Sequence, residues 1–153
     1  MESTARALAL LLLLCPLPAL VGADDPKPGE KDQDRLQGTW KITEITLSGK
    51  ELALSEVAKV RFIFEGKNLE YIGPMQSDKG TFKLDVTVSP RAIDMLNKDG
   101  KTTSTGIYKF DGDELIWCYA KSPGERPTEF RSKEDSGVIL MRLKKEKVDE
   151  KKK

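Results

Sequence analysis

Catalytic chemistry in this sequence would have to come from carboxylates, lysines, tyrosines or cysteine, because none of its 153 residues is a histidine. Histidine is the side chain most used for acid–base catalysis and a frequent zinc ligand. No pair of the remaining chemical groups stands together in a pattern typical of a reaction, and no glycine-rich phosphate-binding motif is present. We therefore expect no catalytic residues, no metal site and no cofactor, and we rank an enzyme below a binding or interaction protein.

The cysteine with the most informative surroundings is Cys118, which lies in the apolar run 115–120 between Trp117 and Tyr119. Apolar surroundings raise the pKa of a thiol and make it inert. We interpret Cys118 as a packed structural thiol. Two cations close in sequence, Lys121 and Arg126, keep a reactive thiol as the alternative.

Arg126 is the strongest candidate for a polar binding residue, because it precedes Pro127 in the segment GERPTEF. Proline holds the residue before it in an extended conformation, and a guanidinium on a fixed backbone suits anion recognition. The alternative is an ion pair with Glu125 or Glu129 that fixes a long loop. Both interpretations stay open at the level of sequence.

The acidic residues are typical of turns and strand surfaces. Asp111 and Asp113 flank Gly112 between two apolar runs, which is the pattern of a tight hairpin. The run 111–114 lacks the spaced oxygen ligands of a calcium loop. Asp94 lies on an expected strand, where it is either an outward-facing residue or a buried functional carboxylate.

The elements that would position these residues are strands, because apolar and polar residues alternate over much of the chain. With the two further segments 68–72 and 91–96, the expected strands are 40–43, 60–65, 68–72, 82–88, 91–96, 108–110, 115–120 and 139–143. Alternation is typical of antiparallel strands with one buried face, and about eight strands can close a small barrel. We predict an all-β protein consisting of a single antiparallel up-and-down β-barrel of about eight strands.

The connections agree with a barrel of hairpins. Turn residues occur at 48–50, 65–68 and 111–113, each between two apolar runs. One segment, 52–58, breaks the alternation and favours a helical turn or two, with Ser55 as a candidate N-cap.

The first segment, 1–23, has the pattern of a signal peptide: Arg6, a short apolar run and small residues before an expected cleavage at Asp24. The apolar run is shorter than a membrane-spanning helix needs, so we favour export over a membrane anchor. Attachment of lipid to Cys15 is the less favoured alternative, since leucine rather than a small residue precedes it.

The remaining chain divides by composition into a linker, a core domain and a tail. Residues 24–35 contain no apolar residue except proline and are expected to be a disordered linker. The barrel is expected over 36–144 and a charged tail over 145–153. A net charge of +1 gives no field that would attract nucleic acid, and no second apolar stretch reaches spanning length. We expect a monomer without a transmembrane segment.

A set of motifs adds to this interpretation. The segments LQGTWK, KVRFIFEG, GTFKLD, RAIDM, GIYKFDGDELIWCYA, GERPTEF and GVILMRLKK follow in this order over 36–145. Together they resemble a lipocalin-like domain family of unknown function that is abundant among exported proteins of planctomycete bacteria. The resemblance implies that Gly38 and Trp40 are structural. It also implies that Trp40 closes the barrel floor against a basic side chain of the last strand, for which Arg142 is the candidate.

The resemblance also implies a small apolar ligand at the mouth of the barrel. We expect Phe82, Tyr108 and Trp117 to form the wall of that site, with Arg126 as a polar contact near the rim. These aromatic residues are more often core than ligand contacts, and the large inward set Trp40, Phe62, Phe64, Phe82, Tyr108, Phe110 and Trp117 favours a filled or small-cavity barrel. The alternative function is therefore an interaction or inhibitor protein with a solid barrel, whose loops contact a protein partner.

Overall fold

The computed structural model describes residues 28–147. The expected signal peptide, Cys15, residues 24–27 of the expected linker and residues 148–153 of the tail lie outside the described residues. The elements follow in the order α1 (Pro28–Leu36), β1 (Gly38–Leu47), β2 (Lys50–Glu51), α2 (Leu54–Val57), β3 (Arg61–Glu65), β4 (Asn68–Ile72), β5 (Ser77–Asp85), β6 (Ala92–Leu96), β7 (Thr102–Asp111), β8 (Glu114–Ala120) and β9 (Val138–Lys145).

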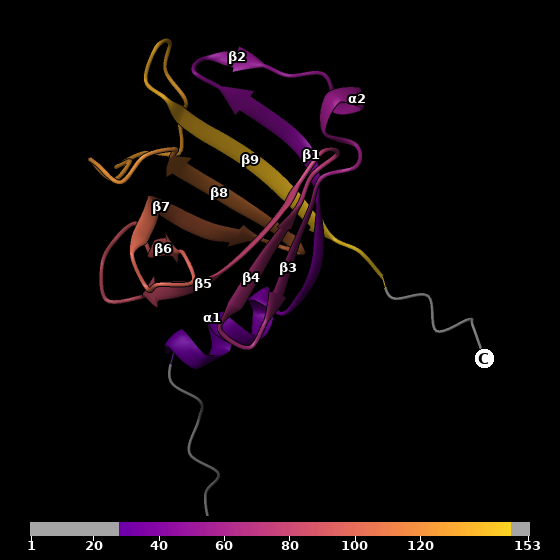
Figure 1. The fold of residues 1–153 in the computed structure, drawn as a ribbon. Coiled ribbons are helices and arrows are strands. Elements are labelled where there is room, and N and C mark those ends of the chain that lie inside the picture. Colours follow the sequence, from indigo (N-terminus) through magenta and orange to yellow (C-terminus); the bar gives the residue numbers. More distant parts are fainter. Residues whose placement is uncertain (1–27, 148–153) are drawn as a thin grey trace, which may run out of the picture.

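Eight of the strands form a closed barrel (Figure 1). From β3 to β9 each strand pairs with the next in sequence, β1 pairs with β3, and β1 also pairs with β9, which closes the sheet. Every pairing is antiparallel. The short β2 extends β1 as an additional hairpin. This arrangement confirms the prediction of an all-β, antiparallel up-and-down barrel.

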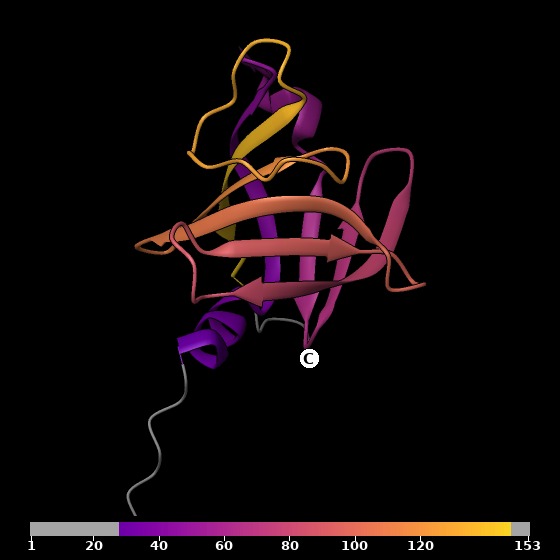
Figure 2. The ribbon, with the colours of Figure 1, turned by 90° about the vertical axis from the view of Figure 1, so that its left-hand side faces the viewer.

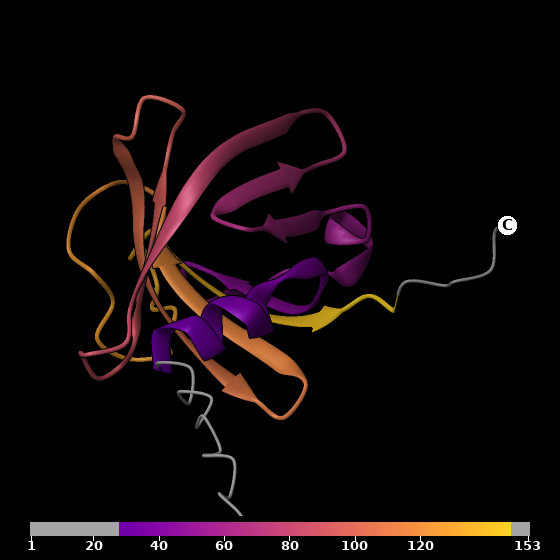
Figure 3. The same ribbon diagram turned by 90° about the horizontal axis from the view of Figure 1, so that it is seen from below.

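The two ends of the barrel differ. Helix α1 lies across one end, as the view from below shows (Figure 3). The turn between β4 and β5 and the long loop between β8 and β9 lie at the other end (Figure 2). The interior is packed with one continuous set of buried apolar side chains, which includes Trp40, Phe62, Phe64, Phe82, Tyr108, Trp117, Met141 and Leu143. The barrel is therefore filled over most of its length.

Helix α1 corrects the prediction of a disordered linker for residues 28–35. Three of its side chains have partners that a composition argument cannot reveal. Asp32 binds Arg91 and Tyr108, the Arg35 guanidinium stacks 3.9 Å from the centre of the Phe110 ring, and Leu36 is fully buried. Ordering this segment is favourable because it covers the end of the barrel.

The connections largely follow the sequence prediction. Gly49, Gly66 and Gly112 adopt positive φ angles in the three expected turns, a conformation that glycine reaches without steric cost. Helix α2 confirms the helical turn expected within 52–58. Its N-cap is Ala53 rather than Ser55, and no side chain caps it.

Trp40 closes the barrel near α1, but its basic partner is not Arg142. The indole is 2 % exposed, its Nε1 donates a 2.7 Å hydrogen bond to the carbonyl of Leu36, and Lys145 Nζ lies 5.1 Å from the ring centre. Lys145 is the register partner of Trp40 across β1 and β9. Arg142 lies between the inward residues Met141 and Leu143, so its side chain points outward, where it contacts Glu44, Asp111 and Glu114.

Candidate functional site

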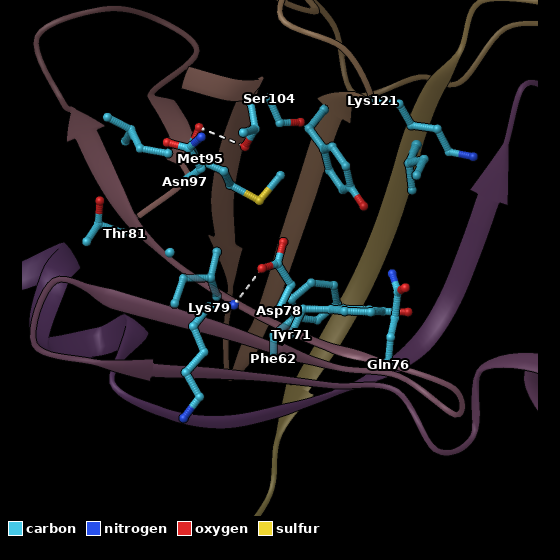
Figure 4. A pocket seen from close by; sticks show the side chains of 16 residues that line it. Phe62, Tyr71, Gln76, Asp78, Lys79, Thr81, Met95, Asn97, Ser104 and Lys121 are labelled. Carbon is cyan, nitrogen blue, oxygen red and sulfur yellow. Dashed lines mark hydrogen bonds between the residues drawn. The ribbon is translucent and has the colours of Figure 1, made fainter. Parts of the chain in front are cut away.

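A cavity of about 590 Å³ opens at the end of the barrel opposite α1 (Figure 4). Its floor is apolar and partly aromatic, and the polar residues around it are exposed or half-buried except Ser104, which is 4 % exposed. The apolar lining residues are Phe62, Leu69, Tyr71, Met95, Leu96, Tyr119 and Ile139. The polar lining residues are Gln76, Asp78, Lys79, Thr81, Asn97, Thr103, Ser104 and Lys121.

The strand order explains why these residues meet. In an up-and-down barrel the end of one strand and the start of the next lie at the same end. Tyr71 at the end of β4, Gln76 in the following turn, Met95 near the end of β6 and Tyr119 near the end of β8 therefore come together, although they are far apart in the sequence.

The floor of the cavity is aromatic. The Phe62 ring centre lies 5.5 Å from that of Tyr71 and 5.3 Å from that of Trp117, and Trp117 in turn packs 5.1 Å from Tyr119. Edge and tilted contacts of this kind are the favourable arrangements of aromatic pairs. Trp117 itself is fully buried beneath the lining.

Trp117 also contains a polar atom without a partner. Its Nε1 is buried and has no hydrogen-bond acceptor among the described residues, which is uncommon for a buried N–H group. Gly106 packs closely beside it, since a Cβ at this position would lie 3.2 Å from Nε1. The indole N–H is therefore a hydrogen-bond donor behind the cavity floor.

The polar rim contains one cation without a neutralising partner. Lys79 pairs with Glu70 at 3.0 Å, whereas no carboxylate among residues 28–147 forms an ion pair with Lys121. Burial raises the pKa of Tyr119, so its hydroxyl stays neutral and can donate or accept a hydrogen bond. The cavity thus combines an aromatic floor, hydroxyl groups and two charged rim residues, Lys121 and Asp78, whose carboxylate accepts a hydrogen bond from the backbone N–H of Lys79.

The aromatic wall expected from the sequence lies elsewhere. Phe82 packs in the core against Phe64, with ring centres 5.1 Å apart, and Trp117 is buried. Tyr108 is 1 % exposed and donates a hydrogen bond to Asp32 at the covered end. None of these three residues, nor Arg126, is in the lining of the open-end cavity.

Arg126 fixes a loop, and its partner is Asp94. The guanidinium binds the Asp94 carboxylate through two hydrogen bonds of 2.6 and 3.1 Å and donates a third, of 2.7 Å, to the carbonyl of Gly106. These contacts attach the β8–β9 loop to the outer surface of β6 and β7. Glu129, one of the partners considered from the sequence, pairs with Lys133 instead. Asp94 is thus an outward-facing strand residue in an ion pair.

Cys118 is fully buried on β8, and its Sγ lies 3.6 Å from the carbonyl oxygen of Glu129. Burial raises the pKa of the thiol, so little reactive thiolate forms at neutral pH. This placement agrees with the interpretation of a packed structural thiol.

In a Cys15→Ser variant, which leaves Cys118 as the remaining thiol of the chain, we expect slow reaction with a disulfide reagent under native conditions. Reaction should become fast in guanidinium chloride, because unfolding exposes the sulfur. The release of the coloured thiolate measures both rates. A native rate equal to that of free glutathione would contradict a structural role and favour a reactive thiol.

The described residues contain no cluster of His, Cys, Asp or Glu that could hold a metal ion. Neither helix between residues 28 and 147 has the length and apolar character needed to cross a membrane. No family model, curated protein or solved structure matches the chain. The class of protein is therefore defined by the fold: an eight-stranded antiparallel up-and-down β-barrel with one end covered by a helix and the other open to a cavity.

Proposed function

We propose that this protein is a non-enzymatic, lipocalin-like binding protein whose small ligand occupies the open-end cavity. The observation that supports this proposal is the cavity itself, whose volume of about 590 Å³ falls within the usual range of small-molecule sites. A barrel that acts only through its loops on a protein partner would need no such hollow end. Export, expected from residues 1–23, would place this binding outside the cytoplasm.

The chemistry of the lining favours an amphipathic ligand over a wholly apolar one. Phe62, Met95 and Tyr119 offer an apolar surface at the floor, and Lys121 offers a positive charge at the rim. A ligand with an apolar body and an acidic group would satisfy both, since the apolar body loses contact with water and the acidic group gains an ionic partner. A medium-chain carboxylate is the simplest molecule of this kind.

Binding of decanoate, measured by isothermal titration calorimetry, tests the proposal. Met95→Trp places a larger ring in the cavity and should weaken binding at least about tenfold, because a filled site loses the apolar contact area of the ligand. Met75→Trp is the matched control, since Met75 is 96 % exposed and lies outside the lining. It should leave binding unchanged.

The role of the rim charge can be separated with a second ligand. Lys121→Gln should weaken decanoate binding and leave decanol binding unchanged, because decanol has no charge to pair with the ammonium group. Equal decanoate affinity in wild type and Met95→Trp would show that the cavity is not the site. Native mass spectrometry of protein purified from its own host shows whether a ligand is retained. If no extra mass is found and the wild type binds neither decanoate nor decanol, ligand binding would not be the function.

A further inference from the structure

A second cavity, of about 410 Å³, lies at the covered end of the barrel beside α1. Three cationic side chains from separate parts of the chain line it: Arg35 at the end of α1, Arg91 before β6, and Lys109 on β7. The rings of Phe110 and Phe130 line the same cavity. Positive charge and aromatic surface therefore meet in one concave site.

The charge in this second cavity is not balanced by the protein. None of its lining residues is acidic. Two lining residues contact the carboxylate of Asp32, which is 4 % exposed and accepts 2.7 Å hydrogen bonds from Arg91 and from the hydroxyl of Tyr108. Within the described part of the chain, neither Arg35 nor Lys109 forms an ion pair with a carboxylate. Two positive charges thus remain.

Both of these cations are held in place by aromatic rings. The Arg35 guanidinium lies 3.9 Å from the Phe110 ring centre, and one of its nitrogens donates to the carbonyl of Gly112 at 3.0 Å. Lys109 Nζ lies 4.7 Å from the Phe130 ring centre. A cation–π contact restrains a cation without neutralising its charge or using all its N–H donors. The donors are therefore preorganised for an anion.

We propose that this second cavity binds a small phosphate monoester with a flat apolar group. A phosphate monoester has close to two negative charges at neutral pH, which matches the two unbalanced cations. Its oxygens accept hydrogen bonds from Arg35 and Lys109, and its flat group lies against Phe110 and Phe130. The site is independent of the proposed function, because the open-end cavity lies at the opposite end of the barrel.

Phenyl phosphate, titrated into the full protein at low salt and followed by calorimetry, tests this site. Inorganic phosphate and benzoate should bind more weakly, since the first lacks the ring and the second has a single charge. Phenol should not bind measurably. Affinity should fall as salt is added, because salt screens exposed charges.

Charge-removing variants locate the site. Arg35→Gln and Lys109→Gln should each weaken phenyl phosphate binding at least about tenfold, the loss expected when one charged hydrogen-bond donor is removed. Lys41→Gln is the control, because Lys41 is exposed on β1 outside this cavity and should leave binding unchanged. Urea denaturation of each variant checks that it is folded.

Three results would overturn the proposal. The first is absence of phenyl phosphate binding to the wild type. The second is an equal loss of affinity in Lys41→Gln, which would show non-specific attraction by surface charge. The third is displacement of phenyl phosphate by decanoate or its loss in Met95→Trp, which would assign the anion to the open-end cavity. Unchanged decanoate binding in Arg35→Gln and Lys109→Gln would leave the proposed function intact in any of these cases.

Discussion

Replacing Trp40 with alanine should lower the free energy of unfolding by about 3–5 kcal/mol, the usual cost of removing a large buried aromatic side chain. The indole is 2 % exposed and belongs to the core. Its loss would also leave the carbonyl of Leu36 without the hydrogen bond from Nε1. Equilibrium unfolding in urea, followed by far-ultraviolet circular dichroism, measures the change.

Trp40→Phe separates the contribution of the buried ring from that of the hydrogen bond to Leu36. It keeps an aromatic ring and removes the indole N–H, so it should cost less than Trp40→Ala. The exposed position Lys41 supplies the control, since Lys41→Ala should change stability by no more than about 0.5 kcal/mol. An unchanged urea midpoint in Trp40→Ala would contradict the role of Trp40 in closing the barrel.

The barrel could be predicted because apolar and polar residues alternate along a strand with one buried face, and this alternation is visible in the sequence. Residues 82–85 and 141–143 show it clearly, and both lie in strands. The start of β7 was missed because Ser104 and Gly106 face inward there and are not apolar. Ser104 satisfies its hydroxyl with the carbonyl of Ala120, which a sequence pattern cannot show.

The candidate site was harder to predict because alternation gives the inward face of a strand and not the height of a residue along the barrel. Phe82 and Trp117 face inward as expected but lie in the packed interior. A usable signal was present in the order of the hairpins: Tyr71, Asn97 and Lys121 all flank turns that an up-and-down barrel places at the same end. The same reasoning about register would have selected Lys145 over Arg142 as the partner of Trp40.

The covered end of the barrel depends on contacts between segments distant in the sequence, and for this reason composition alone predicted disorder for α1. Two of these contacts centre on Asp32, whose carboxylate accepts hydrogen bonds of 2.7 Å from both Arg91 and the buried hydroxyl of Tyr108. Burial of a polar helix residue is tolerated here because both of its partners are provided by the barrel.

Replacing Asp32 with alanine should therefore lower the free energy of unfolding by about 2–3 kcal/mol, because it removes two hydrogen bonds to a charged group and leaves the Tyr108 hydroxyl buried without an acceptor. Tyr108→Phe alone should cost about 1 kcal/mol. Added to Asp32→Ala, it should cost nothing further or restore some stability, since the unpaired hydroxyl is then gone. Urea unfolding of the two single variants and the double variant gives the coupling free energy between Asp32 and Tyr108.

Asp34→Ala changes an exposed acidic position of the same helix. It is the control and should change the free energy of unfolding by no more than about 0.5 kcal/mol. If Asp32→Ala and Asp34→Ala were equally stable, Asp32 would not hold α1 on the barrel, and the order of this segment would have to come from the burial of Leu36 instead.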